Sequence, residues 1–417
     1  MLRILREEEV FVLGAARTPT GAFDGVLREH RAVELGAAAL EAAIGRAGLP
    51  PEAVEMVVMG NVVGAGLGQN PAKQAAVGAG CPHSVHALLV NTVCAAGMAA
   101  IVEGLLAILA GAAGTVAAGG MESRTNAPYL LGPFDRRRRR IRGEVRGDNF
   151  CLEFPPPEAG ADEYRAFVKS LRAAVLKEAN TAEALVCPFN PGVSMKDYGV
   201  RYARRRGWDA AFVDRYAAGS YEKAMRAQAE GAFAEEITAV GGVSRDEIAD
   251  PGLQRALREK SDSPVSSYNA PSLADGAAAV VLAAGGRARE LGARPLARVL
   301  GFCRLDVPPE EFIEAPVRAT RMLMEALAAA GLADGFDIFE GNESFGLQIP
   351  LFQEGVPIER QNVHGGAVAL RHPLGASGAR IVVTLLHAMR RYGLRRGIAA
   401  ICFASGGAFA LALERVE

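Results

Sequence analysis

The sequence has few of the features that mark secreted or nucleic-acid-binding chains. Its six cysteines form no C-x-x-C pair and no disulfide-like cluster, so we expect reduced thiols and a cytoplasmic protein. The first residues, MLRILREEEV, lack the apolar segment of a secretory signal. The formal net charge of -1 gives no electrostatic reason to expect a nucleic acid partner.

The sequence also offers little that would cross a membrane or hold a metal. The longest apolar run, residues 98–120, contains Glu103 and several glycines. We therefore interpret it as a buried helix followed by a strand, and we expect no membrane insertion. Cys81, His83 and His86 in CPHSVH are possible metal ligands, but no matching ligand pair accompanies them. We expect no metal site.

What is present is a long, glycine-rich chain with alternating strand and helix patterns. Its 417 residues, half of them hydrophobic, exceed one ordinary domain and predict two or three packed units. EVFVLGAARTP and VEMVVMGNVV are typical of buried strands, and AVELGAAALEAAIGRAGL has helical spacing. Asn70 and Pro71 predict the N-cap and first turn of a further helix. The alternation predicts an α/β fold.

The character of the chain changes from about Asn126 and changes back at DGAAAVVLAAG. We interpret residues 125–262 as an inserted domain, residues 1–124 and 263–290 as one half of the core, and residues 291–417 as the other. CAAGMAAIVEGLLAILAG and LGASGARIVVTLLHAMRR each start with small residues and precede an apolar strand that ends in Gly-Gly. This weak repeat suggests duplicated halves, although α/β patterning alone can also produce it.

Cys94 stands immediately before the first of these small-residue helix starts. If the helix begins near Ala95 or Ala96, its unpaired N–H groups and its dipole favour the thiolate. The small residues that follow would let a carbonyl approach the sulfur. A small cysteine packed in the core is the alternative.

The last third of the chain adds polar residues at strand ends and helix starts. His372 and Pro373 precede the second small-residue helix start, and Cys402 ends the apolar run AAICF. Asn342 and Glu343 follow the run FDIF. Polar groups beside glycine-rich turns at strand ends are typical of active sites in α/β proteins.

Taken together, these motifs resemble the thiolase family over nearly the whole chain. They occur in the family's order: AARTPTGAF, MGNVVGAGLGQNPAKQAA, VNTVCAAGM, GGMESRTNAPYLL, NAPSLADGAAAVVL, FEGNESF, GGAVALRHPLGASGAR and CFASGG. The resemblance implies the thiolase fold. That fold has two similar βαβαβαββ halves, a five-layered α-β-α-β-α core and an inserted loop domain.

The resemblance also implies roles for particular residues. Cys94 would be the acylated nucleophile, His372 the base that takes its proton, and Cys402 the second acid/base. Asn342 would hold an oxyanion-hole water, and the backbone N–H groups of Cys94 and Ala404 would form a second oxyanion hole. Contacts with CoA or substrate are expected from five residues: Met195, Pro271, Ser272, Phe345 and Arg371.

The function that this set implies is CoA-dependent acyl transfer. CoA would cleave a 3-oxoacyl-CoA to acetyl-CoA (or another acyl-CoA) and a shortened acyl-CoA. Alternatively, the reverse Claisen condensation would run. Both reactions would pass through a cysteine acyl-enzyme. CoA thioesters are the substrates, and no tightly bound cofactor is expected. Alternatives are a related condensing enzyme, or an acyl-CoA-binding subunit that needs an accessory protein. A homodimer or homotetramer is expected.

Several positions depart from the pattern of the family, among them Ala96, which stands where a serine is common. Pro271 stands where a serine often meets pantetheine, His364 replaces an asparagine, and Arg371 stands where glycine is usual. Ala404 interrupts the glycine run after the second cysteine, but its N–H can still serve an oxyanion hole if its φ is negative.

Overall fold

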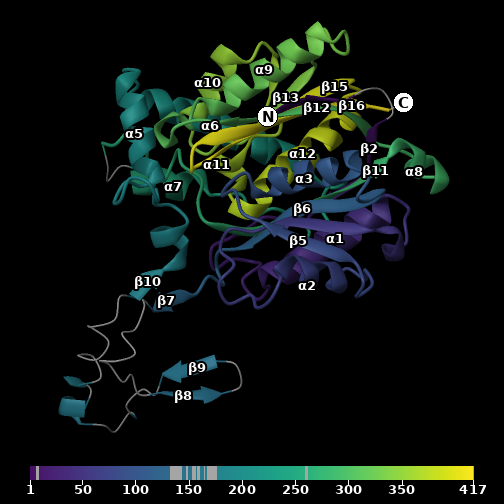
Figure 1. Cartoon of the computed structure of the whole chain (residues 1–417). Helices are drawn as coiled ribbons and strands as arrows, with labels where there is room; N and C mark the ends of the chain where they lie inside the picture. The colour runs from purple at the N-terminus through teal and green to yellow at the C-terminus, as the bar shows by residue number, and fades with distance from the viewer. Residues whose placement is uncertain are drawn as a thin grey trace.

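Two β-sheets with matching strand order form the centre of the molecule (Figure 1). The first has the order β2 (Val10–Arg17), β11 (Ala274–Ala284), β6 (Thr115–Ser123), β4 (Met56–Gly60) and β5 (His86–Val90). The second has the order β12 (Ala297–Asp306), β16 (Gly407–Arg415), β15 (Arg396–Phe403), β13 (Ile338–Gly341) and β14 (Arg360–Gln361). In each sheet the first three strands pair antiparallel and the last three pair parallel. The duplication suggested by the sequence repeat is therefore present in the topology.

The computed structural model describes residues 1–5, 9–131, 143–146, 149–152, 156, 160–163, 165–166, 176–258 and 262–416. Within these residues the two sheets are joined where β2 pairs with β12, through Val12 with Ala297 and Phe11 with Arg298. The short strands β1 (Leu2–Ile4) and β3 (Gly21–Ala22) extend this arrangement by pairing with β12 and β11.

Helices fill the space between the sheets and cover their outer faces. Between them lie α3 (Ala96–Leu109) and α12 (Leu374–Arg391), which pack on each other (Figure 1). The first sheet is covered by α1 (Ala32–Arg46) and α2 (Pro71–Gly78), and the second by α9 (Ala315–Ala329) and α10 (Gln348–Gly355). The layers thus alternate helix, sheet, helix, sheet, helix, as the predicted fold class requires.

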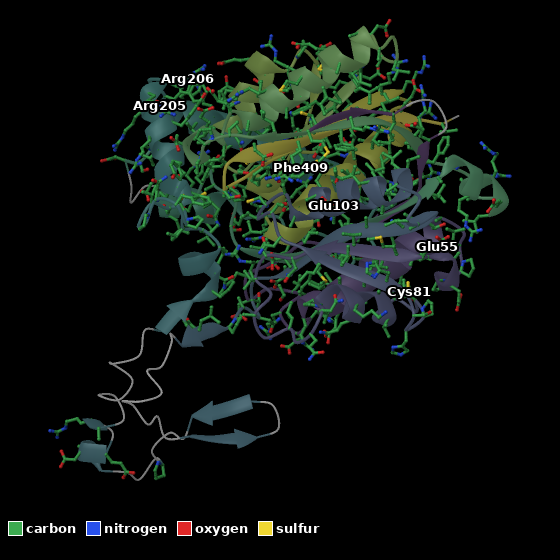
Figure 2. The ribbon with its side chains drawn as sticks, viewed as in Figure 1. Glu55, Cys81, Glu103, Arg205, Arg206 and Phe409 are labelled. Atoms are coloured by element: carbon green, nitrogen blue, oxygen red, sulfur yellow. The ribbon has the colours of Figure 1, made fainter. Side chains whose placement is uncertain are left out.

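The apolar run at 98–120 forms α3 and β6, as the sequence predicts. Its one charged residue, Glu103, is exposed on α3 (Figure 2). In the described part of the chain, no helix combines the length and apolar composition needed to cross a bilayer. The predicted cap of α2 is also confirmed, because the Asn70 side chain accepts a hydrogen bond from the Lys73 N–H at 3.1 Å.

Small residues at the starts of α3 and α12 let the two backbones touch. A Cβ on Gly97 would lie 2.8 Å from the backbone N of Ala379, and a Cβ on Gly378 would lie 2.5 Å from the backbone N of Met98. Any side chain at either position would push the helices apart. This contact places the residues just before the two helices, Cys94 and His372, on the same side of the middle layer.

The chain between β6 and β11 forms the inserted segment beside the core. Its helices within the described residues include α5 (Met195–Arg205), α6 (Ala210–Ala229) and α7 (Pro251–Arg258), and α6 packs on α10 and α11 (Ala367–Leu370). Figure 2 shows Arg205 and Arg206 at its outer margin. The remaining short elements are β7 (Tyr129–Leu131), β8 (Gly143–Arg146), β9 (Asn149–Leu152), β10 (Leu176–Glu178), η1 (Pro51–Ala53), η2 (Ala179–Glu183), η3 (Pro309–Glu311) and α8 (Gly285–Glu290). The expected domain boundaries stay a prediction.

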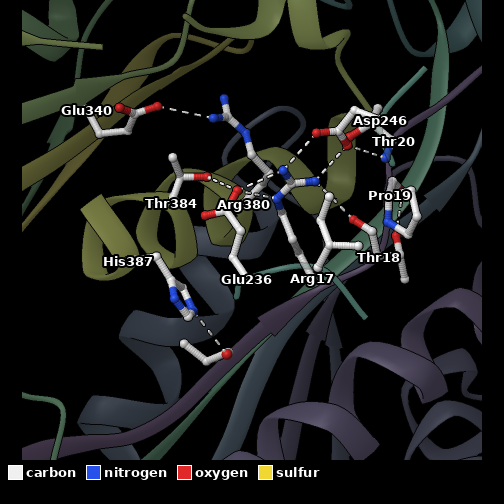
Figure 3. Close-up of polar contacts among 12 residues, drawn as sticks. Arg17, Thr18, Pro19, Thr20, Glu236, Asp246, Glu340, Arg380, Thr384 and His387 are labelled. Atoms are coloured by element: carbon white, nitrogen blue, oxygen red, sulfur yellow. Dashed lines mark hydrogen bonds and ion pairs between the residues drawn. The ribbon is translucent and has the colours of Figure 1, made fainter. Parts of the chain in front are cut away.

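A buried ion-pair network ties the inserted segment to β2 (Figure 3). The guanidinium of Arg17 donates to both carboxylate oxygens of Asp246, at 2.7 and 2.8 Å, and to Glu236 at 2.7 Å. Asp246 also accepts the N–H of Thr20 at 2.8 Å. Arg17 is only 1% exposed, so its charge depends on these partners.

Replacing Asp246 with alanine is expected to destabilise the fold strongly. The substitution removes a bidentate partner and leaves a buried guanidinium under-compensated, which costs about 3–5 kcal/mol in comparable buried pairs. Urea unfolding would measure the loss in the free energy of unfolding. Asp306→Ala is the matched control, because Asp306 pairs with Arg304 at the surface and exposed pairs contribute about 1 kcal/mol or less. Equal losses in the two variants would contradict the expectation.

Candidate active site

Cys94 lies in a strained turn between β5 and α3. Val93, the residue before it, has a φ of 52°, which is costly for a β-branched side chain. Helix α3 then begins at Ala96, with Ala95 as its N-cap, so the predicted position of Cys94 at a helix N-terminus is confirmed. The turn brings the thiol to a cavity of about 380 Å³, where Cys94 forms part of the lining.

The free Cys94 thiol is held in its neutral form. Burial raises its pKa well above the usual value, the neighbouring Cys402 thiol raises it further, and the positive charge of Arg124 opposes both. A buried neutral thiol is a weak nucleophile, so Cys94 needs a base to become reactive.

His372 lines the same cavity from the start of α12. Its Nδ1 lies 2.5 Å from the hydroxyl oxygen of Ser377, and that hydroxyl donates to the Pro373 carbonyl at 2.8 Å. Because the hydroxyl proton is already used, we assign the hydrogen of the imidazole to Nδ1. Among the described residues, Nε2 has no hydrogen-bond partner. Its lone pair is therefore available to accept a proton.

The charge state of His372 suits this role. Burial, helped by the positive charges of Arg124 and Arg380, lowers the pKa of His372 to about 3. The imidazole is therefore neutral near pH 7 and can act as a base. The raised pKa of Cys94 and the lowered pKa of His372 both disfavour a separate thiolate and imidazolium. We therefore expect the proton to move from Cys94 to His372 as the sulfur attacks a bound carbonyl.

Cys402 lies at the end of β15, next to the cavity wall. Its sulfur is 3.1 Å from the Ser344 hydroxyl and accepts a hydrogen bond from the Gln348 amide at 3.7 Å. Burial raises the pKa of the Cys402 thiol, and the hydrogen bonds from Ser344 and Gln348 oppose that rise. Ser344, which contacts the sulfur, and Ala404, two residues after Cys402, both line the cavity, so Cys402 lies next to the lining.

Asn342 follows β13 and is fully buried. The side-chain NH2 of Asn342 donates to the Ser344 hydroxyl at 3.0 Å, whereas the side-chain oxygen of Asn342 has no hydrogen-bond partner within the described residues. Asn342, Ser344 and Cys402 thus form one hydrogen-bonded chain. Asn342 itself is not among the described residues that line the cavity.

Of the residues expected to contact CoA or substrate, four line the cavity with Cys94 and His372: Met195, Pro271, Ser272 and Phe345. Arg371 is not among the described lining residues. Its guanidinium donates to the Glu247 carbonyl and to the Ser272 hydroxyl, each at 2.6 Å. Arg371 therefore fixes Ser272 and the inserted segment, and any effect on substrate passes through Ser272.

Two other departures from the family pattern are Ala404 and His364. The described non-glycine residues with positive φ are Asp24, Asn70, Val93, Asn362 and Arg371. Ala404 therefore has a negative φ, which meets the condition for an oxyanion-hole N–H. His364 is buried and contacts the Tyr392 hydroxyl at 3.1 Å, away from the described lining of the cavity.

Sequence reasoning assigned no role to several residues that complete the site. Ser377 orients His372, Ser344 and Gln348 hold Cys402, and Arg124 lines the cavity. Ser344, Ser377 and Arg124 stand inside motifs that the family resemblance had already singled out. Among the described residues, no group of three or more His, Cys, Asp or Glu side chains is arranged to hold a metal ion.

Comparison with family models and known proteins places the whole chain in one group. Residues 10–286 match the model for "Thiolase, N-terminal domain", and residues 293–415 match "Thiolase, C-terminal domain". The chain is 35% identical to an acetyl-CoA acetyltransferase of Schizosaccharomyces pombe and 36% identical to one of Cupriavidus necator. Each alignment covers 98% of this chain and 99% of the relative.

Two solved structures are similar over almost their full length. The Acat5 thiolase of Ascaris suum, in complex with coenzyme A, has a TM-score of 0.82 at 33% identity, covering 98% of this chain and 100% of that one. Human mitochondrial 3-ketoacyl-CoA thiolase, also in complex with CoA, has a TM-score of 0.81 at 28% identity, covering 98% of both chains.

Proposed function

The chain belongs to the thiolase family, and from that premise we propose that it transfers acyl groups between CoA thioesters. The substrate is a 3-oxoacyl-CoA, and the products of its cleavage by CoA are acetyl-CoA, or another acyl-CoA, and a shortened acyl-CoA. The same residues would catalyse the reverse Claisen condensation. The observation that carries the proposal is that Cys94 and a neutral His372 line one cavity, and that Cys402 contacts Ser344, which lines the same cavity.

In the first half of the reaction, His372 Nε2 takes the proton of Cys94 as the sulfur attacks the 3-oxo carbon. We assign the stabilisation of the resulting oxyanion to the backbone N–H groups of Cys94 and Ala404. The bond between carbons 2 and 3 then breaks, and its electron pair leaves with the acetyl-CoA enolate. The Cys402 thiol protonates that carbanion, leaving an acyl group on Cys94 and a Cys402 thiolate.

In the second half, the Cys402 thiolate takes the proton of an incoming CoA thiol, and the CoA sulfur attacks the acyl group on Cys94. The tetrahedral intermediate collapses, the shortened acyl-CoA leaves, and His372 returns its proton to Cys94. Asn342 belongs to the hydrogen-bonded chain that orients Ser344 beside Cys402. We also propose that the Asn342 side chain holds an ordered water that contacts the enolate oxygen. This cycle needs no redox group.

The direct test is to incubate the purified chain with acetoacetyl-CoA and CoA. We expect loss of acetoacetyl-CoA with formation of acetyl-CoA, and an acetyl adduct visible in the intact mass. A panel of longer 3-oxoacyl-CoA substrates then defines the acyl group. If no substrate is cleaved and no adduct forms, the proposal is wrong.

The dependence of activity on pH follows from the lowered pKa of His372. A base is lost as pH falls through its pKa, and for His372 that occurs near pH 3, below the usual value for histidine of about 6.5. We therefore expect that kcat/KM does not fall as the pH is lowered through the usual histidine pKa. Activity profiles between about pH 5 and pH 8 test this, with the fluorescence of Trp208 as a check on folding. An acid limb near the usual histidine pKa would contradict it.

We further propose that the chain assembles as a homodimer or homotetramer and acts in the cytoplasm. An edge strand supports the assembly, since β5 pairs only with β4 among the described strands and exposes Leu88 and Leu89. Sedimentation equilibrium measures the oligomeric state. Turnover by the purified chain alone would exclude the need for an accessory subunit.

A further inference from the structure

Arg371, the residue before His372, has a backbone conformation that is almost reserved for glycine. Its φ of 68° and ψ of 178° lie in a region that a residue with a Cβ enters only at a cost, whereas glycine adopts it freely. Such strain persists in a fold only where the surrounding structure holds it in place. The strained backbone therefore points to a role for the arginine side chain.

The side chain of Arg371 bridges two segments that are far apart in the sequence. Its Nε donates to the Glu247 carbonyl and its Nη1 donates to the Ser272 hydroxyl, each at 2.6 Å. Glu247 is itself fixed to the core, because its N–H donates to the Thr20 carbonyl at 2.9 Å and its carboxylate accepts the Ala22 N–H at 2.9 Å. Arg371 therefore ties the Ser272 side chain to a firmly held anchor.

Ser272 belongs to a loop that forms part of the active-site wall. Residues 270–273, which we call the wall segment, all line the cavity that contains His372 and are neither helix nor strand. The His372 N–H donates to the Ser272 carbonyl, but its distance of 3.4 Å exceeds the usual range of about 2.7–3.2 Å. Pro271 has no N–H to donate. The shorter, charge-assisted bond from Arg371 is therefore expected to hold this segment more firmly.

The bond from Arg371 also decides what the Ser272 hydroxyl can offer to a ligand. A guanidinium has donors and no acceptor, so the Ser272 oxygen must accept this hydrogen bond. The hydrogen of the hydroxyl is then left to be donated elsewhere, and no acceptor for it is found among the described residues. Because Ser272 lines the cavity, a bound acyl-CoA can supply the acceptor. Its carbonyl oxygens, in the thioester and acyl part or in the amides of the pantetheine arm, are suitable.

We propose that Arg371 is a positioning residue, which holds the wall segment so that the Ser272 hydroxyl donates to a carbonyl oxygen of the bound acyl-CoA. This inference rests on the proposed function. Arg371 is not among the described residues that line the cavity, so it acts through Ser272. The wall segment is then ordered before the substrate enters, which lowers the entropic cost of binding.

The effect of Arg371 should appear in substrate binding rather than in the chemical step. The imidazole of His372 is oriented separately, through the contact of its Nδ1 with the Ser377 hydroxyl. Cys94 is likewise placed by the turn before α3. Loss of the Arg371 side chain therefore leaves the reacting groups in place and loosens only the wall against which the thioester binds. A change of this kind raises KM more than it lowers kcat.

Arg371→Gly removes the side chain and relieves the backbone at the same time, so the variant should fold at least as well as the native chain. We expect KM for acetoacetyl-CoA in thiolysis to rise about tenfold, as for the loss of a hydrogen bond to a charged group. We expect kcat to change by less than about threefold. Asp24→Gly is the matched control, because Asp24 also has a positive φ, of 55°, and is exposed. It should keep the native KM.

Three further variants separate an effect through Ser272 from a direct one. Ser272→Ala should raise KM about as much as Arg371→Gly does. The double variant should be no worse than either single variant, because both remove the same interaction. Arg371→Lys keeps a charged donor but cannot make both bonds of the planar guanidinium, so we expect an intermediate KM.

The same comparison in a Cys94→Ala background measures binding alone. Acetoacetyl-CoA is not cleaved there, so isothermal titration calorimetry gives its Kd directly, and the Kd of CoA is measured in the same way. Weaker binding of both ligands after Arg371→Gly would place the accepting carbonyl in the pantetheine arm. Weaker binding of acetoacetyl-CoA alone would place it in the thioester or acyl part. Either pattern supports the inference.

Three results would overturn the inference alone: native KM and Kd values in Arg371→Gly, a fall in kcat at native KM, or a double variant whose losses add. If Arg371→Gly folds poorly, Ser272→Ala and Arg371→Lys still decide, and native KM values in both would overturn it. Failure of the native chain to cleave acetoacetyl-CoA would overturn the proposed function instead. The Kd measurements need no turnover, so the two failures are distinguishable.

Discussion

Cys94→Ala is expected to lower thiolysis by at least about a thousandfold and to abolish the acyl adduct in the intact mass. The reason is that Cys94 supplies the only bond through which the proposed reaction holds the acyl group between its two halves. Alanine fits the site without strain, because Cys94 is a small side chain in a turn whose shape is set by Val93 and the start of α3. Intact mass after incubation with acetyl-CoA, together with steady-state thiolysis, measures both effects.

Cys81→Ala is the matched control for that variant. Cys81 is another buried free thiol, 3% exposed, and it packs in the core around α1 and α2 (Figure 2). Its removal should leave the adduct and the rate close to native values. An adduct that persists in Cys94→Ala would show that another group accepts the acyl chain, and the proposed cycle would then be wrong.

His372→Gln is expected to slow acylation by about a hundred- to ten-thousandfold, the range that general acid–base catalysis contributes. Glutamine can still reach toward Ser377, but it cannot accept the Cys94 proton near neutral pH. Because burial raises the pKa of the Cys94 thiol, hardly any thiolate exists without a base. Rapid-quench measurement of the acyl-enzyme burst isolates this step from the later attack by CoA.

A histidine on the helix that follows His372 provides the control. His387 lies on α12, burial also lowers its pKa, and its Nε2 lies 3.5 Å from the Ala15 carbonyl. It is not among the described residues that line the active-site cavity. His387→Gln should therefore keep a native burst rate. A burst in His372→Gln as fast as in this control would exclude His372 as the base.

Much of the architecture could be predicted from short-range patterns. The small residues before α3 and α12, the apolar runs of β6 and β15 and the Asn70 cap each depend on neighbours in sequence. Such patterns are local, so the chain displays them directly. The position of Cys94 before α3 was predictable for the same reason.

The supporting contacts of the site were not predictable in this way. Ser344 and Gln348 reach Cys402 across more than fifty residues of sequence, and Asn180 reaches Arg124 from the inserted segment. Arg371 has a φ of 68° and donates to the Glu247 carbonyl, more than a hundred residues away in sequence. Contacts of this kind depend on how distant segments pack, which no sequence spacing records.

The close approach of Gly97 to Ala379, and of Gly378 to Met98, has a consequence for how this catalyst can be divided. The proposed nucleophile comes from the first repeat of the chain and its base from the second, and the two helix starts meet with no room for a side chain. Neither repeat could work as a separate ancestral enzyme of this type, since each holds one partner of the reacting pair. A chain cut between the repeats would regain turnover only when its two fragments bind closely enough to restore the backbone contact between the starts of α3 and α12.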